Sequence, residues 1–124
     1  MSWRDRWDEA AVEERLVMER TPVDDLLLQA ASGRYGAYHQ IWYVLARAAG
    51  LRRVARVFLR VLEDESDPLP RYHCAAALLE LLEGSAITPA ELSARPGGVG
   101  DSLTRLRGEL EKRLGPAPGP GESA

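Results

Sequence analysis

Cysteine and histidine are scarce in this sequence of 124 residues. There is one cysteine, Cys74, and there are two histidines, His39 and His73. A single cysteine cannot form a disulfide within the chain, which excludes the disulfide-stapled class of small secreted domains. Cys74 lies in an apolar run, where a thiol usually behaves as a small hydrophobic side chain. We therefore expect a protein of a reducing compartment, the cytoplasm.

The same scarcity argues against a metal centre and against a nucleophilic cysteine. His73 and Cys74 are adjacent, so on a helix their side chains are about 100° apart and do not converge on one ion. A structural zinc site needs four ligands. A catalytic thiol needs a polar cleft, and the alanine-rich segment around Cys74 offers none. We predict no metal, no cofactor and no enzymatic activity.

Long hydrophobic runs and phosphate-binding loops are also missing. The longest mostly apolar stretch, residues 37–51, carries His39, Gln40 and Arg47 and is too short to span a bilayer. The first residues include acids and no apolar segment, so we expect no signal or transit peptide. The glycines at 97–100 follow no strand and lack the Lys-Ser/Thr pair of a P-loop. No membrane segment is predicted, and no small-molecule substrate is identified.

Helix signals recur along the chain, and strand signals do not. Apolar residues repeat at intervals of three and four, and prolines, glycines and capping residues separate the repeats. The predicted helices span about residues 2–20, 22–31, 35–49, 51–64, 70–83 and 101–114, with a short turn opened by the capping box Thr88–Glu91. The pattern predicts an all-α fold of six to seven helices.

Two of these helices differ sharply in the side chains they carry. The helix 35–49 is apolar almost all round, which predicts a central position, with the small residues of the helix 70–83 packed against it. The N-terminal helix is acidic and carries Trp3 and Trp7 on one face, which we expect to pack on the core of the same domain. The chain thus divides into an acidic helix (1–20), a helical domain (21–114) and a disordered Pro/Gly tail (115–124).

A weak internal repeat connects the helical domain with a known class of folds. An offset of 37 residues aligns Arg34-Tyr35 with Arg71-Tyr72, a period close to that of HEAT and armadillo units. Residues 67–78 resemble the second helix of a HEAT repeat: an acid in the turn, an apolar residue followed by Arg, then small residues and Leu. Pro70 stands where that family usually has Val.

The resemblance, which covers about residues 21–84, has implications for architecture and function. It implies a right-handed stack of helical hairpins, either a short HEAT-like α-solenoid or a compact helical bundle. It also implies that the domain binds other macromolecules, usually proteins, through an exposed helix face.

Charge is unevenly divided along the chain. The formal total is −3, from 16 basic and 19 acidic residues. Residues 1–33 sum to −4, residues 34–62 to +6 with no acid, residues 63–94 to −6 and residues 95–124 to +1. The arginine-only block therefore stands between two acidic blocks, and it also holds five of the eight aromatic residues.

In the helix 51–64 the arginines and the apolar residues take opposite faces. The predicted exposed set is Arg52, Arg56 and Arg60 at i, i+4 and i+8, with Arg53 beside them, and the predicted buried set is Val54, Val57, Phe58, Val61 and Leu62. Two interpretations stay open. Acidic neighbours, either the first helix or the segment after Glu63, neutralise these arginines in the folded protein, or the four arginines bind a protein partner with an acidic surface.

Residues 42–61 also resemble a helix-turn-helix, which makes DNA binding the alternative function. Ala46 stands four residues before Gly50, where the motif has a small residue, and an arginine-rich helix follows. The motif has an apolar residue six positions after the glycine, where this chain has Arg56, and the acidic total weakens nonspecific attraction to DNA. We therefore expect a non-enzymatic protein-binding module, an adaptor, inhibitor or immunity-type partner, ahead of a DNA-binding protein.

Overall fold

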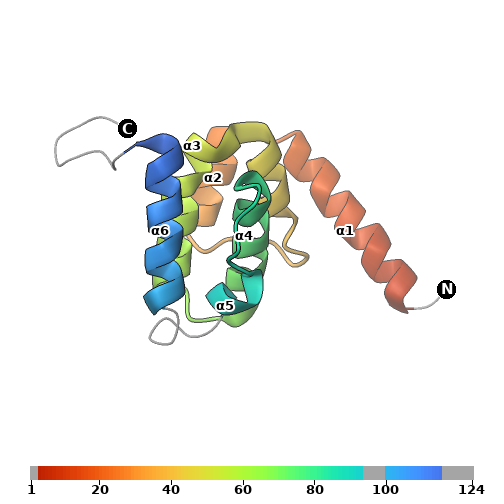
Figure 1. Cartoon of the computed structure of the whole chain (residues 1–124). Coiled ribbons are helices and arrows are strands. Elements are labelled where there is room, and N and C mark those ends of the chain that lie inside the picture. The colour runs from red at the N-terminus through yellow and green to blue at the C-terminus, as the bar shows by residue number, and fades with distance from the viewer. Residues whose placement is uncertain (1–2, 94–99, 116–124) are drawn as a thin grey trace.

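Six helices make up the computed structural model, which describes residues 3–93 and 100–115 (Figure 1). They are α1 (Trp3–Glu19), α2 (Val23–Ala31), α3 (Gln40–Asp64), α4 (Pro68–Leu81), α5 (Pro89–Ser93) and α6 (Gly100–Leu114). Helices take up 79% of the described residues, no strand occurs among them, and the helices pack as a compact bundle. The all-α prediction is confirmed. Ser2, residues 94–99 and most of the predicted tail, 116–124, lie outside the described residues.

Helix α3 forms the centre of the bundle and is sharply bent at Gly50. Gly50 has a φ of 79° and a ψ of 169°, a backbone conformation that side chains other than glycine rarely adopt. The rings of Trp42 and Phe58, one from each half, meet edge to face with their centroids 5.3 Å apart. A straight helix would separate residues 16 positions apart by about 24 Å. The predicted break at Gly50 is therefore present, although no loop separates the two halves.

The first half of α3 begins at Gln40, so the predicted start at Tyr35 is wrong. Gly36 (φ 80°) and His39 (φ 58°) have left-handed backbone conformations that a right-handed helix does not accept. The loop is held in this shape from a distance, because the carboxylate of Glu14 in α1 accepts backbone N–H groups from Ala37 (2.9 Å), Tyr38 (3.2 Å) and Gln40 (3.2 Å).

Helix α4 packs along α3 through small side chains, as expected. Asp67 caps its first turn by accepting the Leu69 N–H at 3.0 Å, and Pro68 occupies the first helical position, two residues before the predicted start. Cys74, Ala75, Ala77 and Leu78 are fully buried against the core. Small residues at this contact let the two backbones approach closely.

Arg71 of α4 is the one charged residue that is fully buried among the described residues. Its guanidinium donates to the carbonyl oxygens of Leu62 and Glu65, at and after the end of α3, and to that of Leu92 in α5 at 2.8 Å. Burial lowers the pKa of Arg71 below its ordinary value. One side chain thus joins the ends of α3 and α5 to the start of α4.

Helix α1 projects from the bundle, and its N-terminal end diverges from the other helices (Figure 1). Glu14 and the buried Met18 attach its second half to the bundle. Trp3 is 74% exposed and Trp7 is 49% exposed, although the Trp7 ring meets that of Tyr38 edge to face at 4.7 Å. The expectation that both indoles pack on the core is therefore wrong for Trp3, and Trp7 is covered only in part.

Replacing Arg71 with Met should lower the free energy of unfolding by roughly 2–5 kcal/mol, because buried carbonyl groups lose their hydrogen bonds. Chemical denaturation followed by circular dichroism measures this change. Arg113→Met is the matched control, since Arg113 donates to the Glu83 carbonyl at 2.7 Å but is exposed, and it should cost less than about 1 kcal/mol. Equal losses in the two variants would contradict the assigned role.

Replacing Glu14 with Ala should loosen the loop 36–40 and the attachment of α1. The loss of charge-assisted hydrogen bonds should destabilise the protein by roughly 1–3 kcal/mol and should speed cleavage of this loop in limited proteolysis. Glu13→Ala removes a neighbouring exposed carboxylate and should stay within about 0.5 kcal/mol of the wild type. Unchanged proteolysis of Glu14→Ala would contradict the prediction.

Candidate functional site

The second half of α3 presents a row of arginines on its outer face. Arg52, Arg56 and Arg60 are exposed, whereas Val54 and Phe58 on the opposite face are fully buried. Positions four apart on a helix are separated by about 6 Å along its axis. The three guanidinium groups therefore form a regular line, which is called the arginine row below.

Arg53, the fourth predicted contact residue, has a partner within the molecule. Its guanidinium forms an ion pair with Asp24 at the start of α2. Arg52, Arg56 and Arg60 form no ion pair with any acid of the described residues. An ion pair within the molecule thus neutralises one of the four arginines. Its partner lies in α2, whereas the sequence pointed to the first helix or to the segment after Glu63.

Two arginines of α6 provide a contrast to the row. Arg105 pairs with Glu91 at 2.6 Å, and Arg107 pairs with Glu63 at 2.6 Å. The latter pair engages Glu63, which follows Arg60 by three residues. The row accordingly keeps its positive charge in the folded protein.

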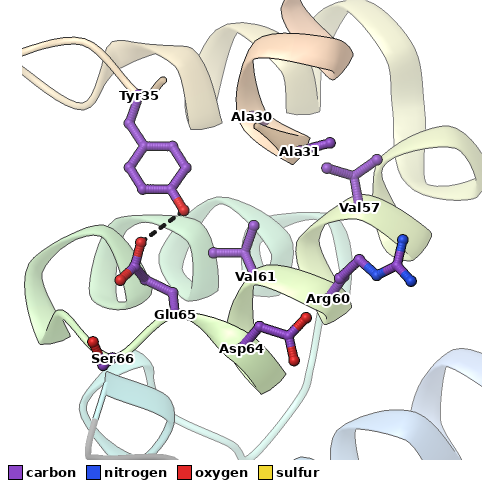
Figure 2. A pocket seen from close by; sticks show the side chains of 9 residues that line it. All are labelled: Ala30, Ala31, Tyr35, Val57, Arg60, Val61, Asp64, Glu65 and Ser66. Atoms are coloured by element: carbon purple, nitrogen blue, oxygen red, sulfur yellow. Dashed lines mark hydrogen bonds between the residues drawn. The ribbon is translucent and has the colours of Figure 1, made fainter. Parts of the chain in front are cut away.

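Beside the row lies an open hollow of about 220 Å³ between α2 and α3 (Figure 2). Its lining residues are Ala30, Ala31, Tyr35, Val57, Arg60, Val61, Asp64, Glu65 and Ser66. In Figure 2, Ala31 and Val57 face each other across the apolar part, and the guanidinium of Arg60 extends away from the Tyr35–Glu65 pair. The hollow is smaller than a usual drug-sized binding site but large enough to receive an apolar side chain.

Two lining residues of this hollow, Tyr35 and Glu65, are joined by a hydrogen bond. The Tyr35 hydroxyl donates to Glu65 Oε1 at 2.8 Å. Burial, and then this bond to Glu65, raise the pKa of Tyr35 above its ordinary value of 10.0. The pKa of Glu65 is lowered from 4.5, first by the Asp67 backbone N–H and then by the Tyr35 hydroxyl. Glu65 is therefore ionised at neutral pH and Tyr35 is not.

The two histidines lie together on another part of the bundle. Their rings stack with centroids 4.8 Å apart and planes 9° apart, and His73 Nδ1 is 2.8 Å from the Tyr43 hydroxyl. Burial, and then the neighbouring His39, lower the pKa of His73. Lone pairs of stacked rings run parallel and do not converge on one ion. No group of three or more His, Cys, Asp or Glu residues suited to a metal ion occurs within residues 3–93 and 100–115.

Cys74 lies in the core, apart from both features. It is fully buried, and its thiol donates to the Phe58 carbonyl across 3.6 Å. Burial raises the pKa of this thiol well above its ordinary value. A buried thiol of raised pKa is a poor nucleophile.

Some residues that organise this surface were not identified from the sequence. In the sequence, Arg71 belongs to the HEAT-like pattern, and Glu14 is one acid of an acidic helix. A lone arginine beside Pro70 at the start of an otherwise apolar helix was a usable signal for Arg71. No local signal indicates that Glu14 binds a loop more than 20 residues away.

Comparisons with protein-family models, with curated proteins and with solved structures found no match. The observations thus define a class by structure alone, an all-α bundle of six helices with an arginine row beside a small hollow. Within the described part of the chain, no helix has both the length and the apolar character needed to cross a membrane.

The stability of the protein should fall as the pH falls below about 6.5, in part because of His73. Its pKa is lower in the folded state than the ordinary 6.5, so the unfolded state binds more protons just below that pH, and protonation favours unfolding. Urea unfolding at about pH 7.5 and about pH 5.5, on either side of the ordinary histidine pKa, measures the effect. His73→Gln should show a smaller loss than the wild type. An equal loss in both proteins would rule out the contribution of His73.

Proposed function

We propose that this protein is a non-enzymatic protein-binding module, an adaptor, inhibitor or immunity-type partner of the cytoplasm, whose contact surface is the arginine row. The observation that carries the proposal is that Arg52, Arg56 and Arg60 are exposed on one helix face and pair with no acid of the described residues. Arg53, Arg105 and Arg107 have carboxylate partners. Other exposed arginines, such as Arg20 and Arg34, also lack an ion pair among the described residues, but they do not repeat along one helix face as the row does. Unpaired like charges on a rigid helix repel one another, and an anionic partner would relieve this repulsion.

The chemistry of the row suits carboxylates on a partner protein. A guanidinium binds a carboxylate through two parallel hydrogen bonds, and its weak hydration makes it well suited to interfaces. The row repeats at about 6 Å, which is also the spacing of acids four apart on a partner helix. The neighbouring hollow can take an apolar side chain, so charge and apolar contact would be combined in one interface.

The resemblance to HEAT repeats is consistent with this mode of binding. In HEAT-like folds, helical hairpins stack and an exposed helix face binds the partner. In this protein the bent α3 packs against both α2 and α4, and its second half carries the arginine row on its outer face. We include a HEAT-like arrangement of residues 21–84 in the proposal.

DNA is the second candidate ligand, and two observations favour a protein over DNA. A helix-turn-helix joins its helices by a turn of three or four residues, whereas the two halves of α3 meet at the single residue Gly50. Position 56, six residues after Gly50, is also an exposed arginine, whereas a helix-turn-helix has an apolar residue there.

The triple variant R52E/R56E/R60E should lose capture of its protein partner from native lysate, by at least about tenfold, while its helical circular dichroism is unchanged. Charge reversal replaces attraction by repulsion at all three positions. The matched control is R6E/R20E/R34E, which makes the same change in net charge at exposed arginines outside the row and should retain capture. Quantitative mass spectrometry of the captured proteins, with and without nuclease, provides the measurement.

Two outcomes would count against the proposal. Capture that survives reversal of the row would reject the row as the contact surface. Tight, salt-dependent binding of duplex DNA by the wild type, lost in R52E/R56E/R60E, would favour the DNA alternative instead.

A further inference from the structure

The described part of α1 exposes much more apolar surface than the other helices do. Five of the eight large hydrophobic residues recorded as exposed belong to it: Trp3, Trp7, Val12, Leu16 and Val17. These residues lie on more than one side of the helix, since Trp7 contacts Tyr38 of the bundle whereas Val12 and Leu16 face away from it. Exposed apolar residues with polar neighbours mark surfaces that contact another molecule. Helix α1 is also the helix that projects from the bundle in Figure 1, so it is accessible from several sides.

The outer face of α1 has an apolar centre and acidic borders. Glu14 and Met18 hold the inner face against the bundle. On the opposite face lie Val12 and Leu16, which are 41% and 43% exposed. The acids that border this pair are Glu9 and Glu13 on one side and Asp8 and Glu19 on the other, all exposed. This set is called the acidic strip below.

The acidic strip and the arginine row are complementary in charge and in spacing. Glu9 and Glu13 are four residues apart, as are Arg52 and Arg56, so both pairs repeat at about 6 Å. Val12 and Leu16 match the apolar part of the hollow, where Ala31 and Val57 face each other. The strip therefore offers carboxylates to the unpaired arginines and apolar side chains to the hollow.

The two surfaces do not meet within one molecule. No ion pair joins α1 to Arg52, Arg56 or Arg60 in the described structure. In Figure 1, α1 projects from one side of the bundle, while the second half of α3 lies beside α6 on the other side. The strip of one molecule can therefore reach the row only on another molecule.

We propose that the chain binds a second copy of itself, with the acidic strip of one copy seated on the arginine row and hollow of the next. This inference rests on the proposed function and names the partner of the same surface. Because the strip and the row are different surfaces on opposite sides of each chain, the contact is head-to-tail, and further copies can add in the same way. Each contact combines three guanidinium groups with carboxylates and an apolar pair with the hollow.

Sedimentation equilibrium of the full chain tests this inference. The wild type should show a concentration-dependent mass of twice the monomer or more, and added salt should weaken the association because exposed charges are screened. Two variants, R52E/R56E/R60E and E9R/E13R, should each be monomeric, since like charges would then face each other. E80R/E83R, which reverses one exposed acid near the end of α4 and one just after that helix, should associate as the wild type does.

Mixing the two monomeric variants provides the decisive measurement. In the mixture, the native acidic strip of one variant meets the native row of the other, and the reversed pair is complementary too. Association should return in the mixture although neither variant associates alone. A folding defect in either variant would not be repaired by mixing, so restored association supports the inference.

The outcomes separate this inference from the proposed function. A wild type that stays monomeric at its highest attainable concentration, or a mixture that does not associate, overturns the inference. If capture from lysate still depends on the arginine row in that case, the proposed function stands with a different protein as partner. If neither association nor capture depends on the row, both are overturned.

Discussion

The fold depends on one buried cation. Arg71 is fully buried, and a charge removed from water is tolerated only when its hydrogen-bonding groups find partners. Here Nη1 and Nη2 donate to the carbonyl oxygens of Leu62, Glu65 and Leu92, while the buried Nε has no partner among the described residues. These oxygens belong to the end of α3, the turn that follows it and α5, so three segments must be in place at once. The interaction therefore selects a single geometry for this end of the bundle.

That geometry in turn orients the surface on which function is proposed. The second half of α3 is fixed at its end by Arg71 and at its beginning by the bend at Gly50, and Arg53 ties it to Asp24 of α2. With the helix held on one side, Arg52, Arg56 and Arg60 point outward on the other. Rigid placement lowers the entropy cost of ordering long side chains when a partner binds.

Helix α1 is held in a different way. A single carboxylate, that of Glu14, accepts three backbone N–H groups of the loop before α3, and this loop approaches so closely that a Cβ on Gly36 would lie 2.7 Å from Glu14 Oε1. The inner face of α1 is thereby occupied, while Val12, Leu16 and their acidic neighbours stay exposed. The small net charge of −3 is the sum over a chain whose basic row and acidic strip lie apart in the folded molecule.

The sequence by itself determined the helical class, most helix limits and the outer position of the arginine row. The bend at Gly50, the proline after Asp67 and the Thr88–Glu91 capping box, whose Thr88 N–H to Glu91 bond is 2.7 Å, all act within about four residues, so a local pattern reveals them. Only the tertiary structure decided that α3 starts at Gln40 and that Trp3 is exposed. It also decided that Arg53 is paired while Arg52, Arg56 and Arg60 are not, and that Arg71 joins three segments of the core. These outcomes depend on contacts between segments distant in sequence, such as Asp24 with Arg53, and helical periodicity carries no information about which distant segments meet.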